Sequence, residues 1–349
     1  MLPYAGIDIY QGYNVLYSSS GEFSVIMQIS NPVLQYCADP QQYLNYQHIL
    51  LNACKILGEN HSIQKQDIFI RKSYQGKPRK EFLEQKYQEH FSGREYTEIQ
   101  TYIIFTCQVK KGTFYTFSAD ALNNFLLSIG KIYELFVQAN LDPVFLDKQQ
   151  IDHYVKRVLS MDFSSEQIAV DNIHACGSQI QIGKNAVRCI SLVDTDEINL
   201  PEKIGAYTNK TESSGIQDFP VDNFFFLYDI PAYHCFIYNQ IIEIPAQRKL
   251  LNRLQIKRNR HQGIPDPANT LCVEDIDRLL IDVARVNQLL VNTHFSIVLC
   301  CQQQHIERSA SFIESALFQQ GIIPSRNAFN QLELFRCALP ANARELKGY

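Results

Sequence analysis

The sequence lacks the features of membrane-spanning and exported proteins. No apolar run approaches the roughly 18–20 residues that a helix needs to cross a bilayer. The opening residues, Met1 to Gly6, show no basic stretch followed by an apolar core, so we expect no signal peptide. A net charge of −4 gives no overall attraction to nucleic acid or to acidic membranes. An apolar fraction of 46% is ordinary for a globular fold.

A convincing nucleotide-binding motif is also missing. Gly177 and Gly183-Lys184-Asn185 resemble a phosphate-binding loop, but five residues separate the glycines where the motif has four. Asn185 stands where a hydroxyl should reach magnesium. The flanking pattern predicts strand–turn–strand, which offers no helix N-terminus for phosphates. We therefore predict a hairpin turn here, no nucleotide site and no cofactor.

Cysteines and carboxylates give only weak hints of catalysis. The ten cysteines are scattered and mostly lie in apolar segments, so we expect buried, reduced thiols of a cytoplasmic protein. Cys300 and Cys301 lack the spacing of structural zinc, and neighbours on a strand point to opposite faces. The segment Asp194-Thr-Asp196-Glu197 could bind a cation or do acid–base work, although it more simply forms a solvated loop. A stand-alone hydrolase is therefore the least favoured function.

Hydrophobic periodicity predicts an α+β protein of two successive units, residues 1–160 and 161–349. Each unit has the order hairpin, helical segment, strand, helix, strand. Helices that connect strands favour crossover connections in mixed sheets, and the repeated order suggests a ferredoxin-like duplication. Expected helices span 39–57, 80–91, 118–139, 147–159, 246–260, 273–291 and 305–320. Expected strands span 13–17, 23–29, 63–70, 99–109, 180–182, 187–193, 224–228, 233–244, 294–301 and 332–338.

The first candidate contact surface is an aromatic hairpin between Phe219 and Ile244. Two apolar runs flank a short turn at Asp229-Ile-Pro231, which is typical of a β-hairpin. Its many aromatic side chains suit a half-buried pleated surface. Tyr233 and Tyr238 are the proposed contact residues, since Tyr and Phe are favoured at interfaces.

The second candidate contact surface is the basic stripe, defined as Lys249, Arg253, Lys257 and Arg260 of the helix predicted over 246–260. Leucines occupy the other side of this helix, so it is amphipathic. The basic stripe could contact anionic lipid or nucleic-acid phosphates. It could equally be the ordinary solvated face of a helix packed by its leucines. No aromatic residues lie among the basic ones, as base-stacking surfaces would need.

Short segments spread in order over the chain carry a family resemblance. They are Asn14-Val-Leu with Gly21, Lys65 to Phe69, Ser191 to Asp196 with Leu200-Pro201, His234, Tyr238-Asn-Gln240 and Leu339-Pro-Ala-Asn342. In these segments the chain resembles the N-terminal region of the TraG-type conjugation ATPases of Bacteroides-type conjugative transposons. That family is similar to the large cytoplasmic ATPase of type IV secretion systems. Residues 263–270 depart from the family pattern, which puts a partner contact there in doubt.

The resemblance implies a non-catalytic docking and assembly module. Its expected partners are inner-membrane channel proteins of conjugation or secretion and further copies of itself, with no small-molecule substrate. Its expected location is the cytoplasmic face of the inner membrane. In the family a RecA-like ATPase domain follows this region, whereas this chain ends at Tyr349 without a phosphate-binding loop. A nucleic-acid-binding module that uses the helix over 246–260 is the alternative.

Overall fold

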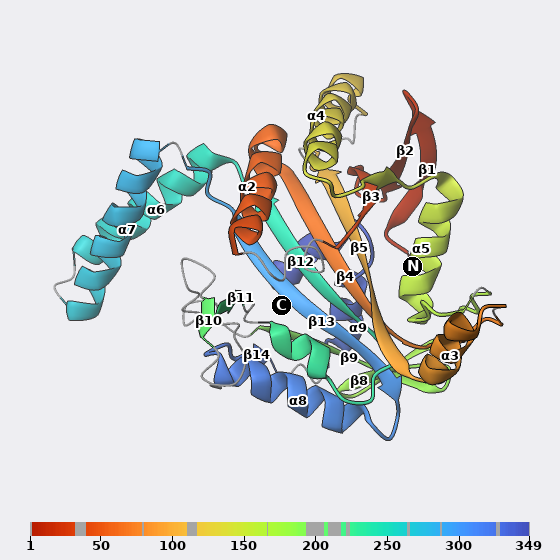
Figure 1. Cartoon of the computed structure of the whole chain (residues 1–349). Coiled ribbons are helices and arrows are strands. Elements are labelled where there is room, and N and C mark those ends of the chain that lie inside the picture. The colour runs from red at the N-terminus through yellow and green to blue at the C-terminus, as the bar shows by residue number, and fades with distance from the viewer. Residues whose placement is uncertain are drawn as a thin grey trace.

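The computed structural model describes residues 2–31, 40–78, 80–109, 117–165, 167–192, 206–208, 218–220, 224–263, 266–286, 288–325 and 329–348. One 12-stranded sheet forms its centre, in the order β1-β2-β3-β5-β4-β12-β13-β9-β8-β7, with β6 beside β3 and β14 beside β9 (Figure 1). The strands are β1 Tyr4–Tyr10, β2 Tyr13–Ser18, β3 Phe23–Ile29, β4 His61–Ser73, β5 Glu95–Cys107, β6 Val144–Phe145, β7 Ile173–Cys176, β8 Gln179–Ile182, β9 Asn185–Leu192, β12 Cys235–Ile244, β13 Asn292–Gln302 and β14 Pro324–Ser325. A separate ribbon pairs β10 Ala206–Thr208 with β11 Asp218–Pro220.

Helices cover both faces of the sheet. The α-helices are α2 Pro40–Leu57, α3 Phe82–Phe91, α4 Ala119–Gln138, α5 Lys148–Ser160, α6 Gln247–Gln262, α7 Pro267–Val286, α8 Ile306–Gln319 and α9 Gln331–Cys337, and two 3-10 helices are η1 Phe225–Asp229 and η2 Ala343–Gly348. Successive strand residues point to opposite faces. Accordingly Ile237 of β12 packs in the core formed with α5, α9 and η2. Its neighbour Phe236 packs in the core formed with η1 and α8, and α2 and α4 cover the first half of that second face.

One continuous sheet contains strands from both halves of the chain. Where the halves meet, β12 pairs with β4 from Cys235↔Ile70 to Ile244↔His61. Counted from its outer edge, the first half has the order β1-β2-β3-β5-β4, and the second half has β7-β8-β9-β13-β12. The short strands β6 and β14 each pair with the third strand of their half. The two halves thus have the same strand order around the β4–β12 junction.

The α+β prediction is confirmed, whereas the prediction of mixed sheets is wrong. All described strand pairs are antiparallel. The reason is that each crossover connection skips one strand position, so that the two strands it joins are not neighbours in the sheet. The connection through α2 leads from β3 to β4, two places away, and β5 then fills the gap between them. In the second half β13 lies between β9 and β12 in the same way. The division of the chain near residue 160 stays a prediction.

Several predicted helices are confirmed, and local capping groups mark their ends. Asp147 and Gln150 form a capping box at the start of α5, with Gln150 N to Asp147 Oδ1 at 2.8 Å. The Ser118 hydroxyl accepts from Ala121 N at 3.3 Å to cap α4. Gly58 follows α2 with a φ of +72°, the left-handed conformation that ends a helix at low cost. Local capping chemistry therefore fixed these boundaries.

Three element predictions are wrong, and several strands were missed. Residues 225–229 form the 3-10 helix η1, so the aromatic hairpin does not exist, and β12 pairs instead with β4 and β13. Residues 332–338 belong to α9, because Gln331 exchanges hydrogen bonds with the Cys189 backbone at 2.8 and 3.0 Å and turns the segment onto the sheet. Helix α7 spans Pro267–Val286 rather than the predicted 273–291, with proline at its first position. Strands β1, β6, β7, β10, β11 and β14 were not predicted.

The buried thiols match the expectation from sequence. All nine described cysteines are free, and seven of them are buried. Burial raises the pKa of Cys54 to about 11 and the pKa values of Cys107 and Cys337 to about 12. Such thiols stay protonated and are poor nucleophiles. No helix within the described ranges is long and apolar enough to cross a membrane.

Candidate interaction surface

A pair of helices projects from one end of the sheet (Figure 1). These helices, α6 and α7, connect the central strands β12 and β13, and we call residues 247–286 the arm. Helix α6 buries none of its residues, and its leucines at 250, 251 and 254 are half-buried. Arg258 of α6 forms a bidentate ion pair with Asp277 of α7, with Nε–Oδ1 and Nη2–Oδ2 distances of 2.5 and 3.1 Å. This planar pairing fixes the register of one helix on the other.

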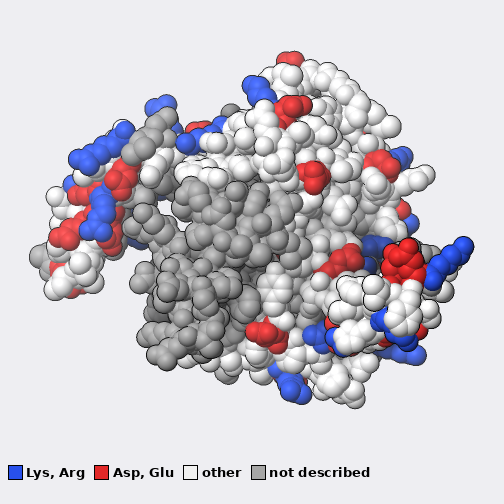
Figure 2. Space-filling view, viewed as in Figure 1, with Lys and Arg blue, Asp and Glu red and all other residues white. Residues whose placement is uncertain are grey.

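The basic stripe lies on the exposed side of the arm. Lys249, Arg253, Lys257 and Arg260 are all exposed, and no ion pair links them to a carboxylate of the described residues. Residues three and four apart share one face of a helix, so the stripe extends over about 16 Å of its length. Helix α6 contains no Asp or Glu. Figure 2 shows Lys and Arg atoms along the outer edge of the arm. Helix α6 therefore presents a row of cations to a partner, and acidic side chains of the arm lie beside it in the same view.

The two tyrosines expected at a contact surface are instead buried. Tyr233 is 2% exposed, its hydroxyl bonds the Thr97 hydroxyl at 2.8 Å, and the Arg71 guanidinium lies 4.2 Å from its ring centre. Tyr238 is 8% exposed, and its hydroxyl accepts from Gln240 Nε2 at 2.9 Å. The physical reason is that β12 is a central strand with helices on both faces. The expected aromatic contact surface is therefore part of the core.

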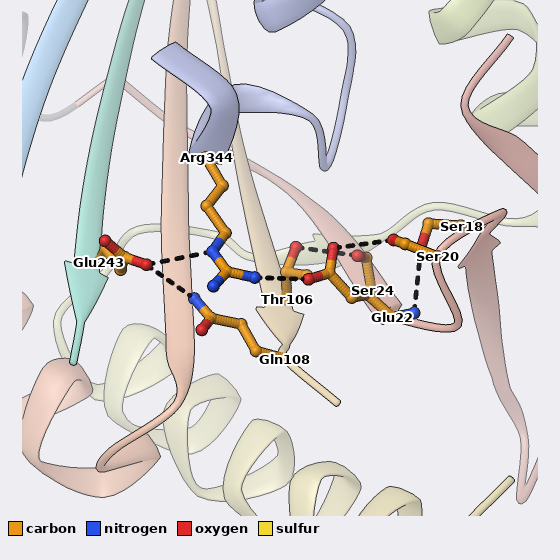
Figure 3. Close-up of polar contacts among 8 residues, drawn as sticks. All are labelled: Ser18, Ser20, Glu22, Ser24, Thr106, Gln108, Glu243 and Arg344. Atoms are coloured by element: carbon orange, nitrogen blue, oxygen red, sulfur yellow. Dashed lines mark hydrogen bonds and ion pairs between the residues drawn. The ribbon is translucent and has the colours of Figure 1, made fainter. Parts of the chain in front are cut away.

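A polar cluster that sequence reasoning missed anchors the C-terminal segment (Figure 3). Arg344 of η2 binds Glu22 at 2.8 Å and Glu243 of β12 at 3.1 Å. Gln108 Nε2 also donates to Glu243 Oε1 at 3.4 Å. One guanidinium thus holds carboxylates from both halves of the sheet. The only sequence signal was Glu243, a carboxylate inside an apolar strand.

A second buried network runs along the β4–β12 junction. Gln64 and Gln66 of β4 donate to the Asn239 side-chain oxygen of β12 at 2.8 and 2.9 Å. The same Gln66 amide donates to Ala338 O at 2.7 Å, and Ala341 N donates to Gln64 Oε1 at 2.8 Å. Buried amides satisfied in this way specify one arrangement of the chain. They fix residues 338–344 across the centre of the sheet.

Two cavities are lined in part by charged side chains. The larger has a volume of about 770 Å³, and its lining includes Lys65, Glu243 and Arg344. Lys65 is ion-paired with Asp67, and Arg344 with Glu243, so these charges are already neutralised. No group of three or more His, Cys, Asp or Glu side chains with metal-site geometry occurs among the described residues. The Asp194–Glu197 cluster lies outside the described residues.

The candidate contact residues differ in their exposure. The basic stripe and the arm that carries it form the most prominent candidate contact surface, and of the six predicted contact residues the four on α6 are exposed together. Comparison with known proteins adds no assignment, since no protein-family model and no curated protein matches the chain.

Proposed function

We propose that this chain is a non-catalytic docking and assembly module of a conjugative-transfer ATPase of the type IV secretion kind. The observation that carries the proposal is the projecting arm, whose four exposed cations form no ion pair with a described carboxylate. The resemblance to the N-terminal region of TraG-type ATPases supplies the partners, which are inner-membrane channel proteins and copies of the same protein. The module works at the cytoplasmic face of the inner membrane and holds no nucleotide.

We further propose that each half of the fold is a ferredoxin-like unit behind a hairpin. The equal strand order of the two halves supports this, as does the place of β6 and β14 beside the third strand of their half. In each half a helical element joins the two innermost strands, α3 between β4 and β5 and the arm between β12 and β13. The duplicated sheet then serves as a rigid platform, and these two insertions carry the contacts.

The test compares charge reversal on the arm with charge reversal elsewhere. In cells that carry the intact conjugation genes, Lys249→Glu with Arg253→Glu should reduce co-purification of the channel proteins at least about tenfold, because lost attractions and new repulsions act together. The matched control reverses Lys131 and Lys148, which are also exposed but lie on α4 and α5. Equal co-purification of both variants would reject the arm as the docking surface.

The same stripe supports one alternative, a nucleic-acid-binding module. Four exposed cations that neutralise four phosphates of a DNA duplex predict a log–log salt slope of about −3.6. Fluorescence anisotropy with a labelled duplex at several salt concentrations measures this slope. A slope of that size, abolished by the Lys249 and Arg253 reversals, would favour the alternative if the channel proteins do not co-purify. A slope near zero would reject it.

A further inference from the structure

Helix α3 presents large apolar side chains to solvent. Phe82 is 69% exposed, Leu83 79% and Tyr87 57%. The helix buries none of its residues. Other large apolar residues are exposed elsewhere on the surface, but three within six residues of one helix form a coherent face.

The helix is held firmly from its other side. The Gln88 carboxamide oxygen accepts from the Tyr74 hydroxyl at 2.7 Å and from Lys77 N at 3.0 Å. Gly76 passes so close beneath α3 that a Cβ there would lie 2.8 Å from the Gln88 carbonyl oxygen. The Arg94 guanidinium lies 5.0 Å from the ring centre of Phe91. Gln88 therefore faces the protein, and the apolar face is turned outward by these contacts.

The outward face carries Lys86 and His90 but no carboxylate. Successive residues of a helix are rotated by about 100° around its axis. Viewed along this axis, an arc of about 140° contains, in order, Phe82, Lys86, His90, Leu83 and Tyr87. The three glutamates at 81, 84 and 89 fall outside this arc. Lys86 is ion-paired with Glu89 at the edge of the arc, with an Nζ–Oε2 distance of 2.6 Å. Residues 76–94 contain five Lys or Arg and three Glu, so their net charge is 5 − 3 = +2.

We infer that α3 is an interfacial anchor, which inserts Phe82, Leu83 and Tyr87 into the headgroup region of an anionic lipid bilayer. Aromatic and leucine side chains flanked by lysines are the composition of helices that lie in this region. The face of a ten-residue helix covers only about 150 Å² by length and width. That is far below the ~800 Å² per partner of a stable protein interface. A bilayer needs only a few apolar side chains together with the positive charge.

This lipid contact is separate from the docking role of the arm. Figure 1 shows α3 and the arm at opposite ends of the sheet. The inference therefore does not rest on the proposed function, and either can fail alone.

The experiment is sedimentation of the full chain with vesicles of phosphatidylcholine alone and of phosphatidylcholine mixed with phosphatidylglycerol. The wild-type chain should sediment with the mixed vesicles. Phe82→Ser with Leu83→Ser should weaken this binding by at least about tenfold, because binding scales with the apolar area inserted. The matched control is Leu127→Ser with Phe318→Ser, two side chains that are 66% and 68% exposed on other helices. This control should bind like the wild type.

Three results would overturn the inference. The first is a wild-type chain that binds neither vesicle. The second is equal binding by the α3 variant and its control. The third is loss of vesicle binding in the Lys249→Glu, Arg253→Glu variant but not in the α3 variant, which would assign the lipid contact to the arm. Circular dichroism of each variant checks that it is folded.

Discussion

The buried amide network at the β4–β12 junction makes a quantitative prediction about stability. Gln66 is fully buried. Its side-chain oxygen accepts from the Tyr154 hydroxyl, and its nitrogen donates to Asn239 Oδ1 and Ala338 O. Burial raises the pKa of Tyr154 well above its usual value, so this hydroxyl stays protonated and donates. The perturbation is Gln66→Leu, a change of similar volume that removes all three bonds.

The expected loss of stability follows from the polar groups that lose a hydrogen-bond partner in this variant. The Tyr154 hydroxyl and the Ala338 carbonyl each lose the partner described here, while Asn239 keeps its bond from Gln64. A buried polar group without a partner costs about 1–3 kcal/mol. Gln66→Leu should therefore lower the free energy of unfolding by about 2–6 kcal/mol, and Tyr154→Phe by about 1–3 kcal/mol.

The double variant separates this network from simple packing. Once Leu replaces Gln66, the Tyr154 hydroxyl has no partner left to lose. Only the Ala338 carbonyl then remains without its partner, so the double variant should be less destabilised than the sum of the single variants by about 2–6 kcal/mol. Equilibrium unfolding in urea, followed by circular dichroism, measures all four proteins. Additivity within about 0.5 kcal/mol would refute the network as an energetic unit.

Three further predictions test other parts of the fold. Burial lowers the pKa of His61 below its ordinary 6.5, so the unfolded chain binds a proton at a higher pH than the folded chain does. Stability should therefore fall as the pH drops below about 6.5. His61→Phe should weaken the dependence of the urea midpoint on pH over this range. Gly76→Ala should displace α3, because the new Cβ meets a carbonyl, and faster proteolysis between 74 and 94 would show it. Arg344→Met leaves the Glu22 and Glu243 carboxylates without their cation and should cost about 2 kcal/mol, with Glu243→Gln restoring part of the loss in the same unfolding assay.

The parts of the fold that sequence predicts are those set by local chemistry. The capping box at Asp147 and the glycine at 58 mark helix ends without reference to distant residues. The basic helix over 246–260 was likewise predicted within two residues of α6. Its leucine spacing and charged face are local properties. The four cations of the basic stripe were therefore correctly placed on one exposed surface.

Long-range pairing decided the features that sequence could not predict. The segment from 224 to 244 does not itself show that β12 pairs with β4 on one side and with β13 on the other. This pairing leaves β12 no free edge for the expected hairpin, and it buries Tyr233 and Tyr238. The apolar face of α3 has the periodicity of a packed helix, yet the bonds of Gln88 turn it outward. Arg344 and Glu22 are far apart in sequence, so their ion pair appears only in the folded chain.

The most direct test of the account is the mass of the native gene product in cells that carry the intact gene. An antibody raised against this chain detects it on an immunoblot. The account predicts a product far larger than the 40.2 kDa of this chain, which contains an ATPase domain. A native product of 40.2 kDa would contradict the claim that the chain is a module of a larger ATPase.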